Sequence, residues 1–347
     1  MKYRPIFIAG CDRSGTTMLG DMLGCSPWAI VTPESQFIHE FVIQMRLTSF
    51  AAADNAAAWL EHNFRFLTWK LSQTRSQLAD LVELDNPRAT VERLLGAYQR
   101  QYHPDLNGAD VWIDHTPDNF KYHPILKDLF PEARFIHVVR DGRAVSASIK
   151  HLNWGPNNAY MASRHWADRL MQALTVEVAE SANCLRVHYE QLVSEPDKVL
   201  SEICRFIDLP FTADMIDGGG LVLPDFTRRQ HRLVGRRPDP EKAQQWKKTT
   251  SRTELRDFES YPLSHTLLER MGYEPVFAAP PRLYPWQILG RYLHEYFRYL
   301  VNRRSHRRME QLILRQRRAV HGLADGNGVP DGTDSKKRRN PIWQSSS

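Results

Sequence analysis

Cysteine is scarce in this sequence, and the few cysteines do not occur in pairs. No CxxC spacing is present, and the four cysteines among the 347 residues are Cys11, Cys25, Cys184 and Cys204. This usage excludes a small disulfide-stapled scaffold. It is typical of reduced thiols in a cytoplasmic protein.

Long apolar runs are also missing. No stretch reaches the roughly 18 consecutive apolar residues of a membrane span. The first predicted strand begins within about five residues of Met1, which leaves no room for a signal peptide. We therefore expect a cytoplasmic protein, neither secreted nor membrane-spanning, although a peripheral position at a membrane stays open.

Net charge is small over most of the chain and concentrated at its end. The total is +6, but residues 1–281 carry 32 Lys and Arg against 35 Asp and Glu. From Arg282 onward there are 14 against 5. The basic character therefore belongs to the C-terminal segment.

Predicted strands alternate with predicted helices. Apolar, β-branched runs at 6–8, 111–117, 135–139 and 184–193 are each followed by a helical pattern. This order predicts the α/β class, with a parallel sheet flanked by helices and ligands at the carboxyl ends of the strands. The helices that we expect cover 16–23, 35–45, two or three segments of 55–101, 118–131, 143–152, 160–182 and 196–209.

The chain is predicted to divide into three parts. Residues 1–281 form the α/β domain, within which 210–250 is expected to be a mobile loop region. Residues 282–322 form a basic amphipathic helix with apolar residues at spacings of three and four. Residues 323–347 have the composition of a disordered tail.

The first strand is followed by a loop typical of phosphate binding. Gly10 and Gly15, followed by Thr16 and Thr17, match the nucleotide-binding loop of the NTPases, except that Thr16 replaces the lysine. Backbone amides at a helix N-terminus bind anions without that lysine. Arg13 is the loop's own cation, so the pattern suits a donor with fewer charges than ATP. The alternative is an ordinary turn in which a threonine caps a helix.

A second cationic position follows the strand at 135–139. Arg140 stands at the tip of this strand, and Ser148 lies two turns into the next helix. A planar guanidinium suits a phosphate group, and a hydroxyl nearby donates to the same anion. An ion pair between Arg140 and Asp141 is the alternative. Two such sites together indicate a ligand with two anionic ends.

The paired motifs resemble those of the sulfotransferases that use 3′-phosphoadenosine 5′-phosphosulfate (PAPS), over residues 5–275. This resemblance implies a P-loop-like nucleotide-binding fold and PAPS as co-substrate, with no metal. "RSGTT" is similar to the 5′-phosphosulfate loop and "VVRDGRAVSAS" to the 3′-phosphate motif. The implied nucleotide-binding residues are Arg13, Ser14, Gly15, Thr16, Thr17, Arg140, Ser148, Tyr189 and Arg236.

The resemblance is strongest to the branch that contains the tyrosylprotein sulfotransferases and bacterial homologues. It implies that Glu34, 21 residues beyond Arg13, is the general base on the acceptor hydroxyl. Arg13 and the loop amides would stabilise the departing phosphate. His115 stands where relatives often carry a lysine, so His115, or Lys121 instead, would assist the leaving group. Without the resemblance, Glu34 reads as a first-turn carboxylate on a helix dipole.

The expected activity is therefore transfer of a sulfuryl group to a hydroxyl, with a carbohydrate or glycolipid as the first acceptor considered. A protein-tyrosine sulfotransferase is the alternative, followed by a P-loop kinase or an inactive nucleotide-binding module. We expect no nucleic acid as a partner. The basic C-terminal helix is predicted to contact either a membrane surface or a second copy of the chain.

Overall fold

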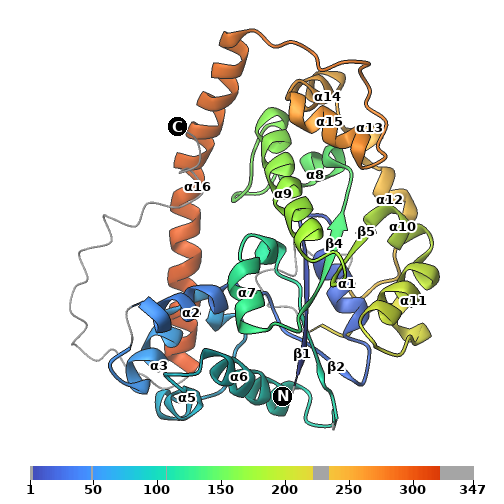
Figure 1. Cartoon of the computed structure of the whole chain (residues 1–347). Coiled ribbons are helices and arrows are strands. Elements are labelled where there is room, and N and C mark those ends of the chain that lie inside the picture. The colour runs from blue at the N-terminus through green and yellow to red at the C-terminus, as the bar shows by residue number, and fades with distance from the viewer. Residues whose placement is uncertain (1–2, 48–49, 107, 222–233, 321–347) are drawn as a thin grey trace.

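The computed structural model describes residues 3–47, 50–106, 108–221 and 234–320, and it contains a parallel sheet (Figure 1). Its five strands run in the order β2-β3-β1-β4-β5, and every neighbouring pair is parallel. The predicted fold class is confirmed. The strands are β1 (Arg4–Gly10), β2 (Ala29–Val31), β3 (Val111–Asp114), β4 (Arg134–Val139) and β5 (Cys184–His188).

Helices cover both faces of the sheet, so the central strands read as continuous apolar runs. In β1, Phe7 packs into the core on one face while Ile6 and Ile8 pack into the core on the other. The first face is covered mainly by α2 (Phe37–Leu47), α3 (Ala53–His62), α4 (Phe64–Leu67), α5 (Arg75–Leu81), α6 (Pro87–Tyr102) and α7 (His123–Leu129). The second is covered by α1 (Thr16–Leu23), α10 (Tyr189–Ser194) and α11 (Pro196–Phe206).

A third apolar cluster lies beyond the tip of β4. It is formed by α8 (Gly142–Ile149), α9 (Ala159–Ala179), α14 (Arg252–Glu259) and α15 (Pro262–Arg270). Trp166 and Phe258 meet at its centre, 5.9 Å apart, and both pack against Gly142. A Cβ at Gly142 would come within 2.5 Å of either ring, so this close approach requires glycine.

Three predicted elements differ from the structure. The strand predicted over 184–193 ends at His188, and helix α10 begins at the next residue. The single helix predicted over 118–131 is two elements, η1 (Pro117–Phe120) and α7, because Pro124 supplies no amide and restarts the helix. The segment 55–101 belongs to four described helices, α3 to α6, rather than two or three.

The loop region predicted for 210–250 is also partly wrong. It contains η2 (Ala213–Ile216), α12 (Pro240–Gln244) and α13 (Trp246–Thr249), and Trp246 is buried with its ring 4.6 Å from the Arg143 guanidinium. The predicted C-terminal helix is present as α16 (Pro285–Val320), which stands along one side of the molecule against α9 and α4 (Figure 1). The tail predicted to be disordered lies outside the described residues. Among the residues described, no helix combines the length and the hydropathy needed to cross a bilayer.

A buried ion network joins the tip of β4 to α14. Arg143 donates from Nε and Nη2 to the Asp141 carboxylate, and from Nη1 to Glu259 and to the carbonyl of Glu274. Glu259 in turn accepts from the backbone amides of Val276 and Phe277. Every charge in this network is hydrogen-bonded, which is the condition for burying it without a large penalty.

Candidate active site

The candidate site lies where the order of strands reverses. After β1 the chain passes to one side of the sheet to reach β2, whereas after β4 it passes to the other side to reach β5. Strands β1 and β4 are neighbours, so their carboxyl ends open a crevice of the kind that binds ligands in open parallel sheets. The loop with Arg13 and the tip with Arg140 both stand there.

The loop after β1 has a backbone conformation that few residues adopt. Arg13 has φ 69° and Gly15 has φ 101°, both in the left-handed region. Gly15 immediately precedes α1, and the buried Thr16 and Thr17 form its first residues. The amides of this turn therefore stand at a helix N-terminus, where they favour an anion.

Arg140 holds the loop in this conformation. Its Nη1 donates to the carbonyl oxygen of Arg13 at 2.8 Å, and its guanidinium stacks 4.2 Å from the centre of the Tyr189 ring. The Tyr189 ring also packs on Gly15, where an added Cβ would come within 2.6 Å of it. The carbonyl of Arg140 accepts from the buried indole of Trp166. The strand tip is thus fixed from both sides.

The two sequence motifs meet directly. Arg13 donates from Nε to the hydroxyl of Ser148 at 3.2 Å, across 135 residues of sequence. Arg13, Arg140, Ser148 and Tyr189 therefore form one cluster, as a ligand with two anionic ends requires. Asp141, the alternative ion-pair partner of Arg140, is engaged by Arg143 instead.

Two guanidinium groups stand close together at this cluster. Burial lowers the pKa of the Arg13 guanidinium, and the nearby charge of Arg140 lowers it further. Within the described part of the chain, the buried Ser14 hydroxyl and the buried Nε of Arg140 have no hydrogen-bond partner. Unsatisfied donors beside two guanidinium groups mark a place for an anionic ligand.

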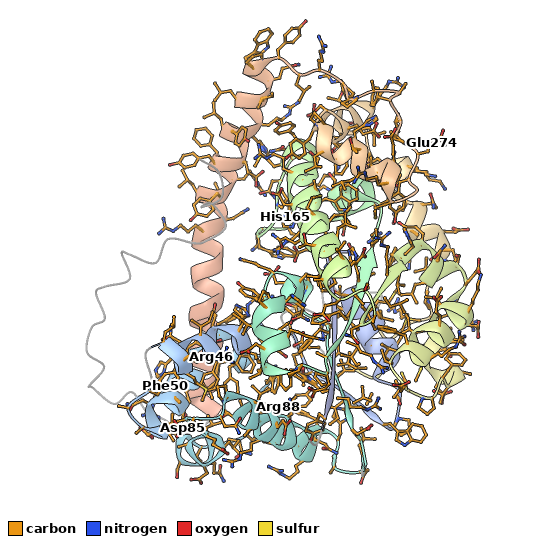
Figure 2. All side chains as sticks on the ribbon, viewed as in Figure 1. Arg46, Phe50, Asp85, Arg88, His165 and Glu274 are labelled. Carbon is orange, nitrogen blue, oxygen red and sulfur yellow. The ribbon has the colours of Figure 1, made fainter. Side chains whose placement is uncertain are left out.

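Asp12 is a carboxylate beside this anion site, yet it is paired elsewhere. Its Oδ2 lies 2.9 Å from Nε2 of His165 and 3.9 Å from Arg169, both on α9 (Figure 2). Burial raises the pKa of Asp12, but the hydrogen bond with His165 and the charges of His165 and Arg169 outweigh it and bring the pKa to about 2. Asp12 therefore stays ionised and neutralised by α9.

Glu34 stands in the turn between β2 and α2, at the same edge of the sheet. The turn is fixed because the Ser35 amide donates to Thr116 Oγ1 at 2.9 Å and the Trp69 indole donates to the Pro33 carbonyl at 3.1 Å. Burial raises the pKa of Glu34 to about 7, against the opposing charge of Arg65. A carboxyl with this pKa can take up and release a proton near neutral pH.

His115 and Lys121 occupy different surroundings. The His115 ring is buried against Gly20 of α1, its two nitrogens have no partner among the described residues, and burial lowers its pKa. The Lys121 side chain is exposed, with its ammonium 5.2 Å from the centre of the Tyr122 ring. Arg236 is exposed.

The family model described as the sulfotransferase family matches residues 5–213, more than half of the chain. The chain belongs to the sulfotransferase family. The prediction of a PAPS-dependent sulfotransferase is thereby confirmed at the level of the family, which excludes the P-loop kinase alternative.

Curated relatives of this sulfotransferase include protein-tyrosine sulfotransferase A of Caenorhabditis elegans, 26% identical over 80% of this chain and 68% of the relative. Protein-tyrosine sulfotransferase 1 of Danio rerio is 25% identical over 80% of this chain and 74% of the relative. A solved structure, the sulfotransferase domain of the Synechococcus PCC 7002 olefin synthase, is 25% identical, with a TM-score of 0.52 over 79% of this chain and 97% of that one. The two curated relatives are thus named for a tyrosine acceptor, not for a carbohydrate.

The sulfotransferase also contains a carboxylate that sequence reasoning missed. Asp21, on α1, accepts from the amides of Gly219, Leu221 and Gly235 at 2.7–3.0 Å. It thereby ties two separate segments to the helix that follows the phosphate loop. The only sequence signal is an acidic residue within the apolar pattern of a buried helix, which is unusual unless the residue is paired.

We predict that Asp21→Asn destabilises the sulfotransferase by about 2–4 kcal/mol, because an amide cannot accept from all three N–H groups. Chemical unfolding measures the loss, and hydrogen exchange should show faster opening at Gly219 and Gly235. Asp214→Asn, at an exposed position in η2, is the control and should change stability by less than about 0.5 kcal/mol. Equal stability of both variants would contradict the role of Asp21.

Proposed function

We propose that this enzyme transfers the sulfuryl group of PAPS to a hydroxyl, with a protein tyrosine as the first acceptor. One observation carries the proposal: Arg140 and Ser148 both contact Arg13, so the two anion-binding motifs form a single site. The two guanidinium groups of that site and the half-buried carboxyl of Glu34 supply the two functions that sulfuryl transfer needs.

The residues at the site fit the nucleotide. The amides around Gly15, with Ser14, Thr16 and Thr17, would hold the 5′ end, since they stand at a helix N-terminus beside an unsatisfied hydroxyl. Arg140 and Ser148 would hold the 3′-phosphate, and Arg236 would add a further cation. Tyr189 supports this arrangement by filling the space between Gly15 and Arg140. When bound, PAPS supplies an activated sulfuryl group on a phosphate leaving group.

The chain's own contribution is charge stabilisation and proton removal. Arg13 and the loop amides stabilise negative charge at the 5′ end, an effect of about 3 kcal/mol for each well-placed donor. Glu34 accepts the proton of the acceptor hydroxyl at a carboxylate oxygen. Its half-buried position keeps the pKa near 7, so the ionised base is present at neutral pH and is more basic than an ordinary carboxylate. His115 or Lys121 remains a proposed aid to the leaving group.

The tyrosine acceptor rests on the relatives rather than on a recognised pocket. Both named relatives are protein-tyrosine sulfotransferases, and each match covers 80% of this chain. A tyrosine hydroxyl has an ordinary pKa near 10, so a base of pKa about 7 can assist its deprotonation only as transfer proceeds. The carbohydrate hydroxyl, which is far less acidic, is the comparison to be tested.

We predict that adenosine 3′,5′-bisphosphate raises the melting temperature by several degrees and that ATP does not. A ligand at about 100 times its dissociation constant stabilises by about 2.7 kcal/mol. Arg140→Met should abolish the shift, whereas Arg205→Met, an exposed arginine on α11, should leave it unchanged. An equal shift with ATP and magnesium would contradict the assigned donor.

We predict that Glu34→Gln lowers the rate of transfer by about 10²- to 10⁴-fold while nucleotide binding persists. The wild-type rate should rise with pH and level off above about pH 7, as Glu34 ionises. The same variant tests the raised pKa of Glu34 through protein stability.

The Glu34 carboxyl ionises at lower pH in the unfolded chain than in the folded one. The free energy of unfolding of the wild type therefore falls as the pH rises from the ordinary pKa of 4.5 to the raised pKa of about 7.

Urea unfolding should therefore show that the stability of the Glu34→Gln protein relative to the wild type rises by up to about 3 kcal/mol between about pH 4.5 and about pH 7. Glu195→Gln, an exposed carboxylate at the start of α11, is the matched control and should change neither the rate nor this pH dependence. Undiminished transfer by Glu34→Gln would remove Glu34 from the mechanism.

We predict that labelled sulfate from PAPS appears on a tyrosine-containing peptide faster than on simple glycans offered at equal concentration. Matched peptides with phenylalanine in place of tyrosine provide the control, since they lack the accepting hydroxyl. Preferential labelling of the glycans would restore the carbohydrate acceptor. Absence of transfer to either, with intact binding of adenosine 3′,5′-bisphosphate, would favour the inactive nucleotide-binding module.

A further inference from the structure

Helix α16 packs on the rest of the chain with polar side chains. Glu295 is buried at 8% exposure, and its Oε2 accepts from the amide of Asn157 and the side chain of Asn158 at 2.9 and 3.1 Å. Arg291 pairs with Asp257 of α14 at 2.5 Å. The inward side of the helix is therefore held by hydrogen bonds and an ion pair.

The outward side of the same helix segment is apolar. Figure 2 shows rings projecting from the upper half of α16 on the side away from α9. Seven large apolar residues of α16 are each at least 41% exposed, and the most exposed, Trp286, reaches 66%. They are Trp286, Leu289, Leu293, Tyr296, Phe297, Leu300 and Val301.

This arrangement is the reverse of an ordinary surface helix, which buries its apolar stripe and exposes its polar face. At about 100° per residue, the seven apolar residues fall on one side of the helix, and Arg291 and Glu295 fall on the opposite side. The apolar face extends over 16 residues, about 24 Å of helix. A contiguous exposed surface of this kind marks an interaction site.

Charge decides between the two partners that such a face could contact. The sequence of α16 continues through seven arginines and one glutamate between residues 303 and 318, and the whole segment from Arg282 carries 14 basic against 5 acidic residues. A second copy of the chain would bring two such segments together and repel. An anionic surface would attract them, by an interaction that depends on salt.

We propose that the apolar face of α16 lies in the interfacial region of an anionic lipid bilayer, with the helix parallel to the membrane plane. Tryptophan, tyrosine, phenylalanine and leucine enter the headgroup boundary readily, and the net positive charge of the C-terminal segment is attracted to anionic lipid headgroups. The polar contacts of Glu295 and Arg291 hold the enzyme on the opposite side of the helix. This surface is independent of the proposed reaction.

Co-sedimentation of the full chain with lipid vesicles tests the proposal. We expect binding to vesicles of phosphatidylcholine with phosphatidylglycerol, weak binding to phosphatidylcholine alone, and release at about 1 M salt, where the screening length falls to roughly 3 Å. The double variant Leu289→Asp, Phe297→Asp should weaken vesicle binding at least about tenfold, because it places two negative charges on the face that would enter the bilayer.

The double variant Val178→Asp, Val276→Asp is the matched control, since both valines are exposed away from α16, Val178 on α9 at 82% and Val276 in the loop after α15 at 43%. It should bind vesicles like the wild type, and circular dichroism should show that both variants fold. Failure to bind anionic vesicles, equal binding to both lipid compositions, or unchanged binding of the Leu289/Phe297 variant overturns the proposal. The proposal is also overturned if sedimentation without lipid shows a dimer of the wild type and of the valine control, but a monomer of the Leu289/Phe297 variant.

Discussion

The hydrogen bond from Arg140 to the carbonyl of Arg13 is the contact on which the site depends. It joins the tip of β4 to a loop whose backbone enters the left-handed region at a non-glycine residue, a conformation that persists only where surrounding contacts enforce it. Tyr189 supports the same loop by filling the space above Gly15. The two anion-binding motifs consequently share one rigid frame, although 135 residues separate Arg13 from Ser148.

This frame brings positive charges together before any ligand arrives. The positive charge of Arg140 makes the charged form of Arg13 less favourable and lowers its pKa. Asp12, the carboxylate next to Arg13, pairs with His165 and Arg169 of α9. The site therefore keeps an electrostatic preference for an anion, at a cost met by the surrounding packing. Burial also makes the ionised form of Glu34 less favourable, which raises its pKa and makes the carboxylate a stronger base.

The sequence predicted those features whose causes are local. Continuous apolar runs identified β1 and β4, and the spacing of Gly10 and Gly15 identified the phosphate loop. Features decided by distant residues were missed. The strand at 184–188 ends where it does because Tyr189 turns into helix α10 against Gly15, and the side of α16 that faces inward is set by Asn157 and Asp257. No pattern within either segment contains that information.

Arg143 shows how far the support of the site extends. Its guanidinium, beside the strand tip that carries Arg140, needs the carboxylate of Glu259, 116 residues later, and the Trp246 ring. The match to the family model stops at residue 213, before both of these partners. A fragment cut at that limit would retain every residue of the two motifs and still leave a buried cation half-neutralised at their base. Folding around the site therefore requires residues beyond the segment that the family model matches.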